Sequence, residues 1–222
     1  MNVIEALAQR KSTRAFLAKE VEREKINTIL DAARHAPSGT NTQPWQVAVV
    51  SGTAKIRLQS KIEAAFRSGD KGRADYHYYP EQWLEPYASR RKECGLLMYK
   101  TLGITRQDRE RQLDQWAANY RAFDAPVMLL FFMDQVMQTG SYIDYGMFLQ
   151  SVMLVAVEQG LATCPQASLA DYPEIIKAEL DYPQDTVLLC GMALGYEDKD
   201  ALVNSYRTSR QDAASFTRFF DY

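Results

Sequence analysis

Seven consecutive apolar residues at 127–133, directly after Asp124-Ala125-Pro126, constrain the fold more than any other feature of this sequence. A run of this length predicts a central β-strand. Further along the chain, apolar side chains between residues 142 and 159 nearly surround a helical axis, which indicates a helix buried in the molecule or in a subunit interface. Gly160 is suited to closing this helix with a left-handed cap.

The remaining elements follow from hydrophobic periodicity and turn residues. Two more strands are predicted at residues 47–50 and 186–194, and Thr53 is a candidate N-cap for a helix that runs toward Ser68. We expect an irregular turn at residues 164–168 and a long, aromatic-rich excursion at residues 69–86. Further helices are predicted at residues 1–9, 22–36, 90–102, 106–120 and around 172–180.

The length of 222 residues favours one domain over residues 1–222, with an excursion around residues 69–123 and an arm around residues 197–222. A net charge of −2 gives no long-range attraction for phosphate backbones, so we expect no nucleic acid partner. The three cysteines, Cys94, Cys164 and Cys190, fit no metal spacing and indicate reduced thiols. Neither a signal peptide nor a membrane span is visible, so we expect a cytoplasmic protein without a membrane partner.

A basic cluster lies at the end of the first predicted helix. It contains Arg10, Lys11, Ser12 and Arg14, and guanidinium groups bind phosphate through paired, charge-assisted hydrogen bonds. The cluster therefore suits a bound monophosphate. Taken alone, however, such a cluster is more commonly solvated or paired with the helix dipole.

A polar loop at residues 37–45 follows the second predicted helix. Ser38, Thr40, Asn41, Thr42 and Gln43 concentrate hydroxyl and amide groups that suit a ribityl chain or the edge of a heterocycle. The alternative is an ordinary polar turn with Trp45 buried beside it. Spacing alone does not decide between the two.

Several common catalytic patterns are missing from the sequence. The two histidines, His35 and His77, are far apart, and there is no Gly-x-Ser-x-Gly elbow, dinucleotide-binding glycine motif or phosphate-binding P-loop. Hydrolysis and metal catalysis are thus disfavoured, and no metal ligands are predicted. Such a chain can still catalyse a reaction if a cofactor carries the reactive atoms and the protein positions them.

The order of these segments resembles the FMN-dependent nitroreductase family. The basic cluster and the polar loop are followed by Asp124-Ala125-Pro126, Gly160-Leu161, Cys164-Pro165-Gln166, residues 191–196 and Arg207-Thr208-Ser209-Arg210, and nearly the whole chain is covered. Tyr79-Pro80, Trp83-Leu84-Glu85-Pro86 and Arg90-Arg91 look most like the branch that includes nitrobenzoate reductases.

The resemblance implies an α+β fold with a central mixed sheet flanked by helices, in an intertwined homodimer with two FMN sites at its interface. Arg10, Ser12 and Arg14, with Arg207 or Arg210, would hold the phosphate and ribityl chain, and Lys11 stands where many relatives have arginine. Pro37, Ser38 and Asn41 would approach from the partner subunit, and Gln43 would reach the flavin or ribityl group.

The resemblance also implies a turn at Pro165, Gln166 and Ala167 whose backbone amide faces the flavin N5, so no catalytic side chain is required. Family members often have glutamate and glycine where this chain has Ala167 and Ser168, and a backbone donor tolerates that change.

The expected activity is a ping-pong transfer of hydride from NADH or NADPH through FMN to nitroaromatics, quinones or similar electron-poor acceptors. The alternatives are reductive dehalogenation, flavin destruction or a non-catalytic flavin-binding dimer.

Overall fold

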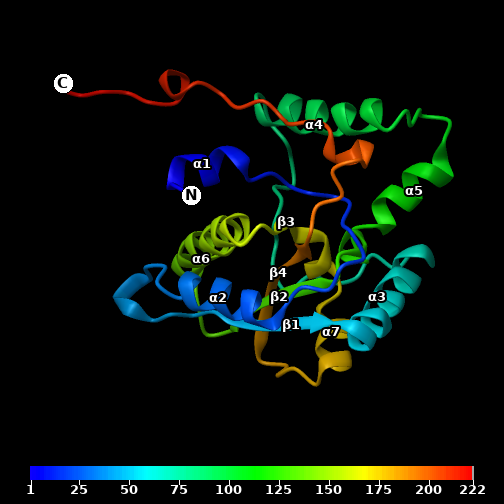
Figure 1. The fold of residues 1–222 in the computed structure, drawn as a ribbon, viewed down its shortest axis with the longest axis horizontal. Helices are drawn as coiled ribbons and strands as arrows, with labels where there is room; N and C mark the ends of the chain where they lie inside the picture. The colour runs from blue at the N-terminus through cyan, green and yellow to red at the C-terminus, as the bar shows by residue number, and fades with distance from the viewer. Residues whose placement is uncertain (222) are drawn as a thin grey trace.

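A four-stranded antiparallel sheet forms the centre of the protein (Figure 1). The computed structural model describes residues 1–221, so Tyr222, the last residue of the expected arm, lies outside the described residues. The strands are β1 (Gln46–Ser51), β2 (Val127–Asp134), β3 (Ala162–Gln166) and β4 (Thr186–Gly195), in the order β1-β2-β4-β3. The α+β fold is confirmed, but all three strand pairings are antiparallel rather than mixed. Parallel pairing is found in the isolated bridge between Ser12 and Thr163.

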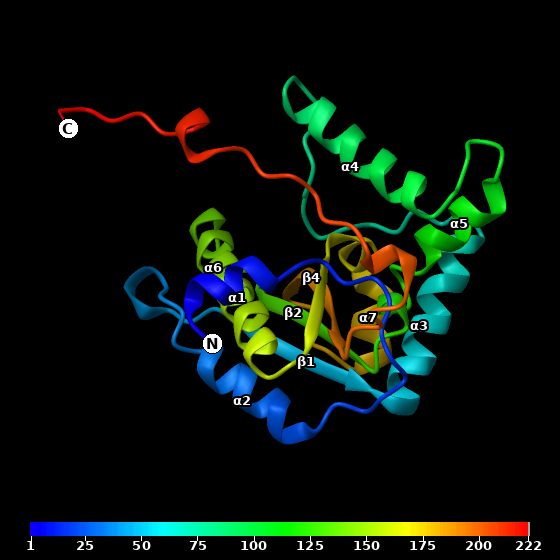
Figure 2. The same cartoon turned by 45° about the horizontal axis from the view of Figure 1, so that its top comes forward.

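Alternating residues of β2 build the two cores on either side of the sheet. Val127, Leu129, Phe131 and Met133 pack with α2 (Arg23–Ala33) and α6 (Thr139–Glu158). The intervening residues, Met128, Leu130 and Phe132, belong to the opposite core, which includes residues of α3 (Gly52–Arg67) and α7 (Pro173–Leu180). Figure 2 shows these helices on opposite sides of the sheet. The prediction of a central strand at residues 127–133 is therefore confirmed.

The helix boundaries follow local capping. Asn2 and Glu5 form a capping box at the start of α1 (Val3–Gln9), in which the Asn2 side chain accepts a 2.9 Å hydrogen bond from the Glu5 amide. Gly160 has a φ of +71° after the end of α6, as its predicted left-handed role requires. The prediction that Thr53 caps α3 was wrong, because the helix begins at Gly52 and Ser51 occupies the N-cap position.

Strand β3 corrects the expectation of an irregular turn at residues 164–168. Residues Ala162–Gln166 pair with β4, and only Ala167 and Ser168 leave the strand, as the start of the 3₁₀ turn η3 (Ala167–Asp171). β3 is an edge strand, so Pro165 can lie within it without disrupting the interior of the sheet.

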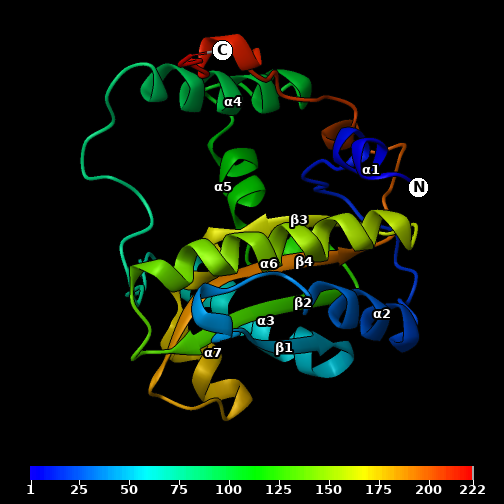
Figure 3. The same cartoon turned by 90° about the vertical axis from the view of Figure 1, so that its left-hand side faces the viewer.

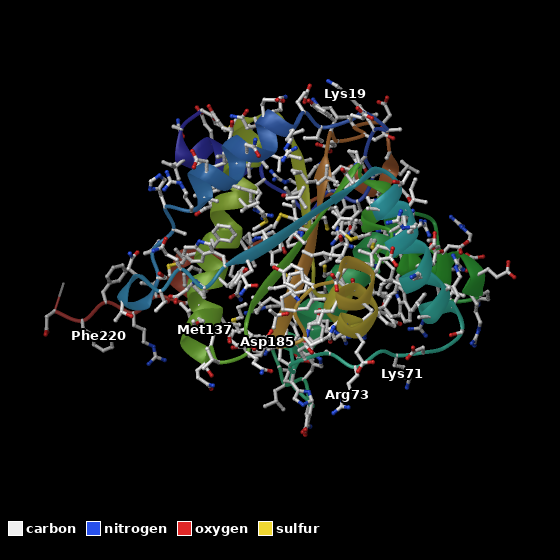
Figure 4. All side chains as sticks on the ribbon, turned by 90° about the horizontal axis from the view of Figure 1, so that it is seen from below. Lys19, Lys71, Arg73, Met137, Asp185 and Phe220 are labelled. Carbon is white, nitrogen blue, oxygen red and sulfur yellow. The ribbon has the colours of Figure 1, made fainter. Side chains whose placement is uncertain are left out.

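Two helices and the arm extend away from the sheet (Figure 3). α4 (Tyr87–Thr101) has no buried residue, and α5 (Arg109–Ala117) connects it to the body. Residues 69–86 contain neither helix nor strand, as expected for the excursion. Figure 4 labels Phe220 on the arm, to one side of the main body, and its side chain is exposed. The other 3₁₀ turns are η1 (Gly39–Asn41), η2 (Ala122–Asp124), η4 (Leu202–Asn204) and η5 (Ala213–Ser215). Across residues 1–221, no helix has both the length and the apolar character needed to cross a membrane.

Candidate functional site

The basic cluster and the beginning of the arm enclose one cavity, which we call the anion pocket. Its volume is about 380 Å³, and it is lined by six residues from the predicted site: Arg10, Lys11, Ser12, Arg14, Arg207 and Arg210. The structure thus brings together two segments separated by nearly 200 positions. The exposed thiol of Cys94 on α4 also lines this pocket.

Backbone and amide contacts hold the arm against the basic cluster. The Arg207 guanidinium donates hydrogen bonds to the carbonyls of Ala8, Gln9 (2.8 Å) and Arg10 (2.6 Å), where the last carbonyls of α1 lack helical partners. The buried Asn204 side chain accepts from the Arg14 amide at 2.8 Å. Asn204 was not identified from the sequence, because nothing in its local pattern distinguishes it.

The charges of the anion pocket are unbalanced. Burial, followed by the positive charges of Arg210 and Arg207, lowers the pKa of Arg10 below its usual value. Lys11 is paired with Glu197 at 2.7 Å, whereas the four arginines of the pocket form no ion pair with any carboxylate in residues 1–221. A bound anion would relieve this repulsion and accept charge-assisted hydrogen bonds.

A second cavity, which we call the aromatic groove, has a volume of about 680 Å³. It is lined by aromatic residues of the excursion and α6, namely Tyr76, His77, Tyr78 and Tyr142. The predicted turn residues Pro165, Gln166 and Ala167 line it as well. Strand β3 joins the two cavities. Thr163 bridges to Ser12 of the basic cluster, and at roughly 3.3 Å per residue Ala167 lies about 13 Å further along.

Unpartnered polar atoms lie along this same path. The Thr163 Oγ1, Gln166 Oε1 and Ser168 Oγ atoms are buried and have no hydrogen-bond partner among the described residues. The other side of the Gln166 amide is engaged, since its Nε2 atom donates to the Asn119 carbonyl at 2.6 Å. An unsatisfied buried polar group costs about 1–3 kcal/mol, so the Thr163 and Gln166 oxygens fit a polar molecule bound along β3.

A bulge in β4 anchors the excursion that forms one wall of the groove. The pairing of β2 with β4 skips Leu189, and the Tyr76 hydroxyl donates to the Leu189 carbonyl at 2.6 Å. Asp75 accepts from the Leu188 amide at 2.9 Å and forms a 3.0 Å ion pair with the buried Lys177. These contacts fix the backbone that carries His77 and Tyr78.

The polar loop at residues 37–45 has a defined shape but lies outside both cavities. Asn41 and Gln43 have positive φ values of 62° and 48°, and the Gly39 amide donates to the buried Asp144 at 3.2 Å. The Ser38 Oγ atom accepts from the Gln43 amide at 2.9 Å. Asn41 and Gln43 are exposed. One protomer therefore does not bring this loop to the anion pocket.

Trp45 and His35, the remaining candidate residues, lie outside the two cavities. Trp45 is half-buried and stacks on Phe148 with ring centroids 4.9 Å apart, a packing role that the sequence left open. His35 is exposed at the end of α2, and within residues 1–221 no group of three or more His, Cys, Asp or Glu side chains is arranged to hold a metal ion.

Comparison with known proteins gives the family. A profile of the nitroreductase family matches residues 7–196. A 4-nitrobenzoate reductase from Pseudomonas putida is 37% identical over 216 residues, which cover 97% of this chain and 94% of that protein. The relatives that share more than 30% identity over most of the chain are named as nitro-group reductases, which does not favour the dehalogenase, flavin-destruction or carrier alternatives.

Solved structures agree with the sequence comparison. The crystal structure of the FMN and NADPH-dependent nitroreductase NfnB from Sphigopyxis sp. strain HMH has a TM-score of 0.96 and 38% identity, with 100% of both chains covered. NfnB from Mycobacterium smegmatis, crystallised with NADPH, has a TM-score of 0.92 and 32% identity over 99% of this chain and 100% of that chain. This chain therefore belongs to the nitroreductase family, in the branch of the nitrobenzoate reductases.

Proposed function

We propose that this protein is an FMN-dependent NAD(P)H oxidoreductase that reduces nitroaromatic compounds, with quinones and related electron-poor molecules as further acceptors. The single observation that carries this proposal is the arginine-lined anion pocket, which lacks ion-paired carboxylates and which β3 joins to an aromatic groove. Relatives that reduce nitrobenzoate and nitrobenzene, and a solved relative named as FMN- and NADPH-dependent, support it.

The residues of the anion pocket would hold the phosphate and ribityl end of FMN. We assign the phosphate to Arg10, Arg14 and Arg210, with the Ser12 hydroxyl beside them, because no carboxylate competes for these groups. Lys11 and Arg207 already make protein contacts and would contribute their remaining donors while they keep the arm in place.

The turn after β3 would support the flavin ring. The groove is lined there by Pro165, Gln166 and Ala167, and the unpartnered Gln166 oxygen lies in the same segment. When bound, FMN supplies the hydride-transfer chemistry between NADH or NADPH and the acceptor. The protein then has to position both substrates in turn and exclude water, which the tyrosines of the excursion and α6 are placed to do.

We further propose a homodimer in which the polar loop of one subunit completes the site of the other. Pro37, Ser38, Asn41 and Gln43 are the residues assigned to this contact. The support is the pre-shaped loop, which reaches neither cavity of its own protomer, and the many apolar side chains exposed on helices. These include Val3, Ile4 and Leu7 of α1, Leu96 of α4 and Ile143 of α6. The three free cysteines support the reducing cytoplasm as its location.

The test begins with the purified 222-residue chain. We expect a yellow protein, or one that takes up added FMN, that oxidises NADPH or NADH only when a nitroarene such as 4-nitrobenzoate is supplied. Initial rates at several concentrations of both substrates should give the parallel lines of a ping-pong reaction. A protein that binds no FMN, or binds it without nitroarene-dependent turnover, would contradict the proposal.

A further inference from the structure

A third cavity of about 340 Å³ lies behind the turn at Ala167, and we call it the side cavity. Ser168, Asp171 and Tyr79 line it, and it shares Ala167 with the aromatic groove. The two cavities also share the three excursion residues Tyr76, His77 and Tyr78. The side cavity therefore adjoins the place where the acceptor would bind.

Two polar side chains of η3 have no hydrogen-bond partner among the described residues. Ser168 and Asp171 are three residues apart in this 3₁₀ turn, a spacing that aligns side chains on one face. The Ser168 Oγ atom is buried without a hydrogen-bond partner, and the Asp171 carboxyl makes no hydrogen bond or ion pair with a described residue. Both groups are thus free to interact with water or a ligand in the side cavity.

The surroundings of Asp171 favour a proton on its carboxyl group. Burial alone raises the pKa of Asp171 to about 6, without compensation from a nearby cation. The titratable groups that line the side cavity or interact with Asp171 come from the excursion, the segment after α5 and the start of α7: Tyr76, His77, Tyr78, Tyr79, Tyr120 and Tyr172. Two charged groups lie beyond them, since Tyr79 also interacts with Arg91 and Tyr172 with Asp70. Near neutral pH a fraction of the molecules can therefore donate a proton from Asp171.

Nitro reduction needs such a donor. Conversion of an aryl nitro group to nitroso consumes one hydride and one proton and releases water, so that ArNO₂ + H⁻ + H⁺ gives ArNO + H₂O. The hydride brings both electrons to the nitrogen group, one N–O bond breaks, and the departing oxygen leaves as water. The proposed function supplies the hydride but leaves the source of the proton open.

We propose that Asp171 is the internal proton donor for the acceptor, acting through the Ser168 hydroxyl and water in the side cavity. The O–H bond of the Asp171 carboxyl breaks, a proton is passed along this relay to the departing oxygen, and the resulting carboxylate regains a proton from solvent. Asp171 is a positioning and proton-storing residue rather than one that touches the acceptor. This role rests on the proposed function, because it concerns the second half of the same reaction.

The test separates proton-requiring from proton-independent acceptors. Holoenzyme is reduced with NADPH and mixed rapidly with 4-nitrobenzoate or with ferricyanide, which accepts electrons without protons, between pH 5 and 8.5. For the wild type, the rate of flavin reoxidation by 4-nitrobenzoate, which we call the nitro rate, should fall about tenfold per pH unit well above pH 6. The rate of reoxidation by ferricyanide, which we call the ferricyanide rate, should not fall in this range. In Asp171→Asn the nitro rate should drop at least about tenfold at pH 6 and lose this pH dependence, while the ferricyanide rate stays the same.

Two further variants and an infrared measurement distinguish loss of the proton relay from a general effect of removing a carboxylate. Ser168→Ala should lower the nitro rate in the same direction, and Asp181→Asn, at an exposed position after α7, should behave as the wild type. An infrared carboxyl band that titrates near pH 6 in the wild type should be missing in Asp171→Asn.

The outcomes distinguish the two proposals. A wild type that reduces neither acceptor contradicts the proposed function. A wild type that reduces both, with an Asp171→Asn profile equal to its own, overturns the role of Asp171 alone. An equal loss with both acceptors overturns it as well, since electron transfer would then be damaged.

Discussion

Single residues of the anion pocket are held in an arrangement that is unfavourable without an anion. Arg10 is the clearest case, because burial and two neighbouring arginines lower its pKa. Arg10→Ala should weaken FMN binding by about 1.5–3 kcal/mol, or roughly 10- to 150-fold in Kd, since one charge-assisted contact is lost. Flavin fluorescence titration measures this effect. Arg34→Ala, at an exposed position on the end of α2 paired with Asp31, is the matched control and should leave the Kd unchanged.

The carboxyl group of Asp171 should also be visible in stability. Because burial raises the pKa of this carboxyl group, it ionises more readily in the unfolded chain than in the folded protein. The resulting loss of folding stability develops between about pH 4 and pH 6 and persists at higher pH. Asp171→Asn removes this penalty. We expect equal stability of variant and wild type at pH 4 and a gain of about 1–2 kcal/mol for the variant at pH 7, after allowance for partial solvent screening. Urea unfolding at the two pH values tests this, and a constant difference would contradict it.

The residues that the sequence did not identify share one property. No local motif marks Asn204, Asp75 or Asp171. The first two accept hydrogen bonds from backbone amides that are distant in sequence, and burial raises the pKa of the third. The arginines could be identified because cationic side chains of the same kind were concentrated in two short segments. Even so, the sequence did not show that Lys11 would be paired with Glu197.

Among the elements, strand β3 was missed for a physical reason. It has only five residues, one of them proline, and a short edge strand is defined by the partner it pairs with rather than by its own composition. β2 was found because burial on both faces of the sheet leaves an uninterrupted apolar run. The mixed sheet expected from the family resemblance was wrong for the four strands, since pairing direction depends on the connections between them.

The anchoring of the excursion to β4 gives a prediction at this scale. Asp75→Ala would leave the Lys177 ammonium buried without its carboxylate, and loss of one partner of such a pair should destabilise the fold by about 2–4 kcal/mol. The double variant Asp75→Ala with Lys177→Met removes both charges and should recover part of that loss. Urea unfolding of the wild type, both single variants and the double variant gives the coupling energy, and strict additivity would contradict the interpretation.

For the whole molecule, the exposed apolar side of α1 gives a prediction about assembly. Val3 and Ile4 are 67% and 80% exposed in the protomer, which is unusual for apolar residues of a packed helix. Ile4→Glu should weaken the proposed dimer and, with it, FMN retention, because the site would need both subunits. Sedimentation velocity over a concentration series measures this. Ile56→Glu on α3, on the other side of the sheet, is the control and should remain dimeric.

The sequence predicted the family and its branch, because the motifs recur in order along nearly the whole chain. The single domain over residues 1–222 stays a prediction. It could not show which cavities the motifs would share, since that depends on the packing of the arm against α1. The separation of the anion pocket from the polar loop likewise required the structure.

The contact between Arg207 and the end of α1 has a consequence for biosynthesis. A growing polypeptide exposes residues 10–14 long before their counterpart at residues 204–210, which is synthesised about 190 residues later. Closing a loop of about 200 residues is slow compared with forming local structure. Flavin loading should thus wait until residues 204–210 have been synthesised and packed against α1, and translation arrested before Asn204 should yield a chain that captures no flavin.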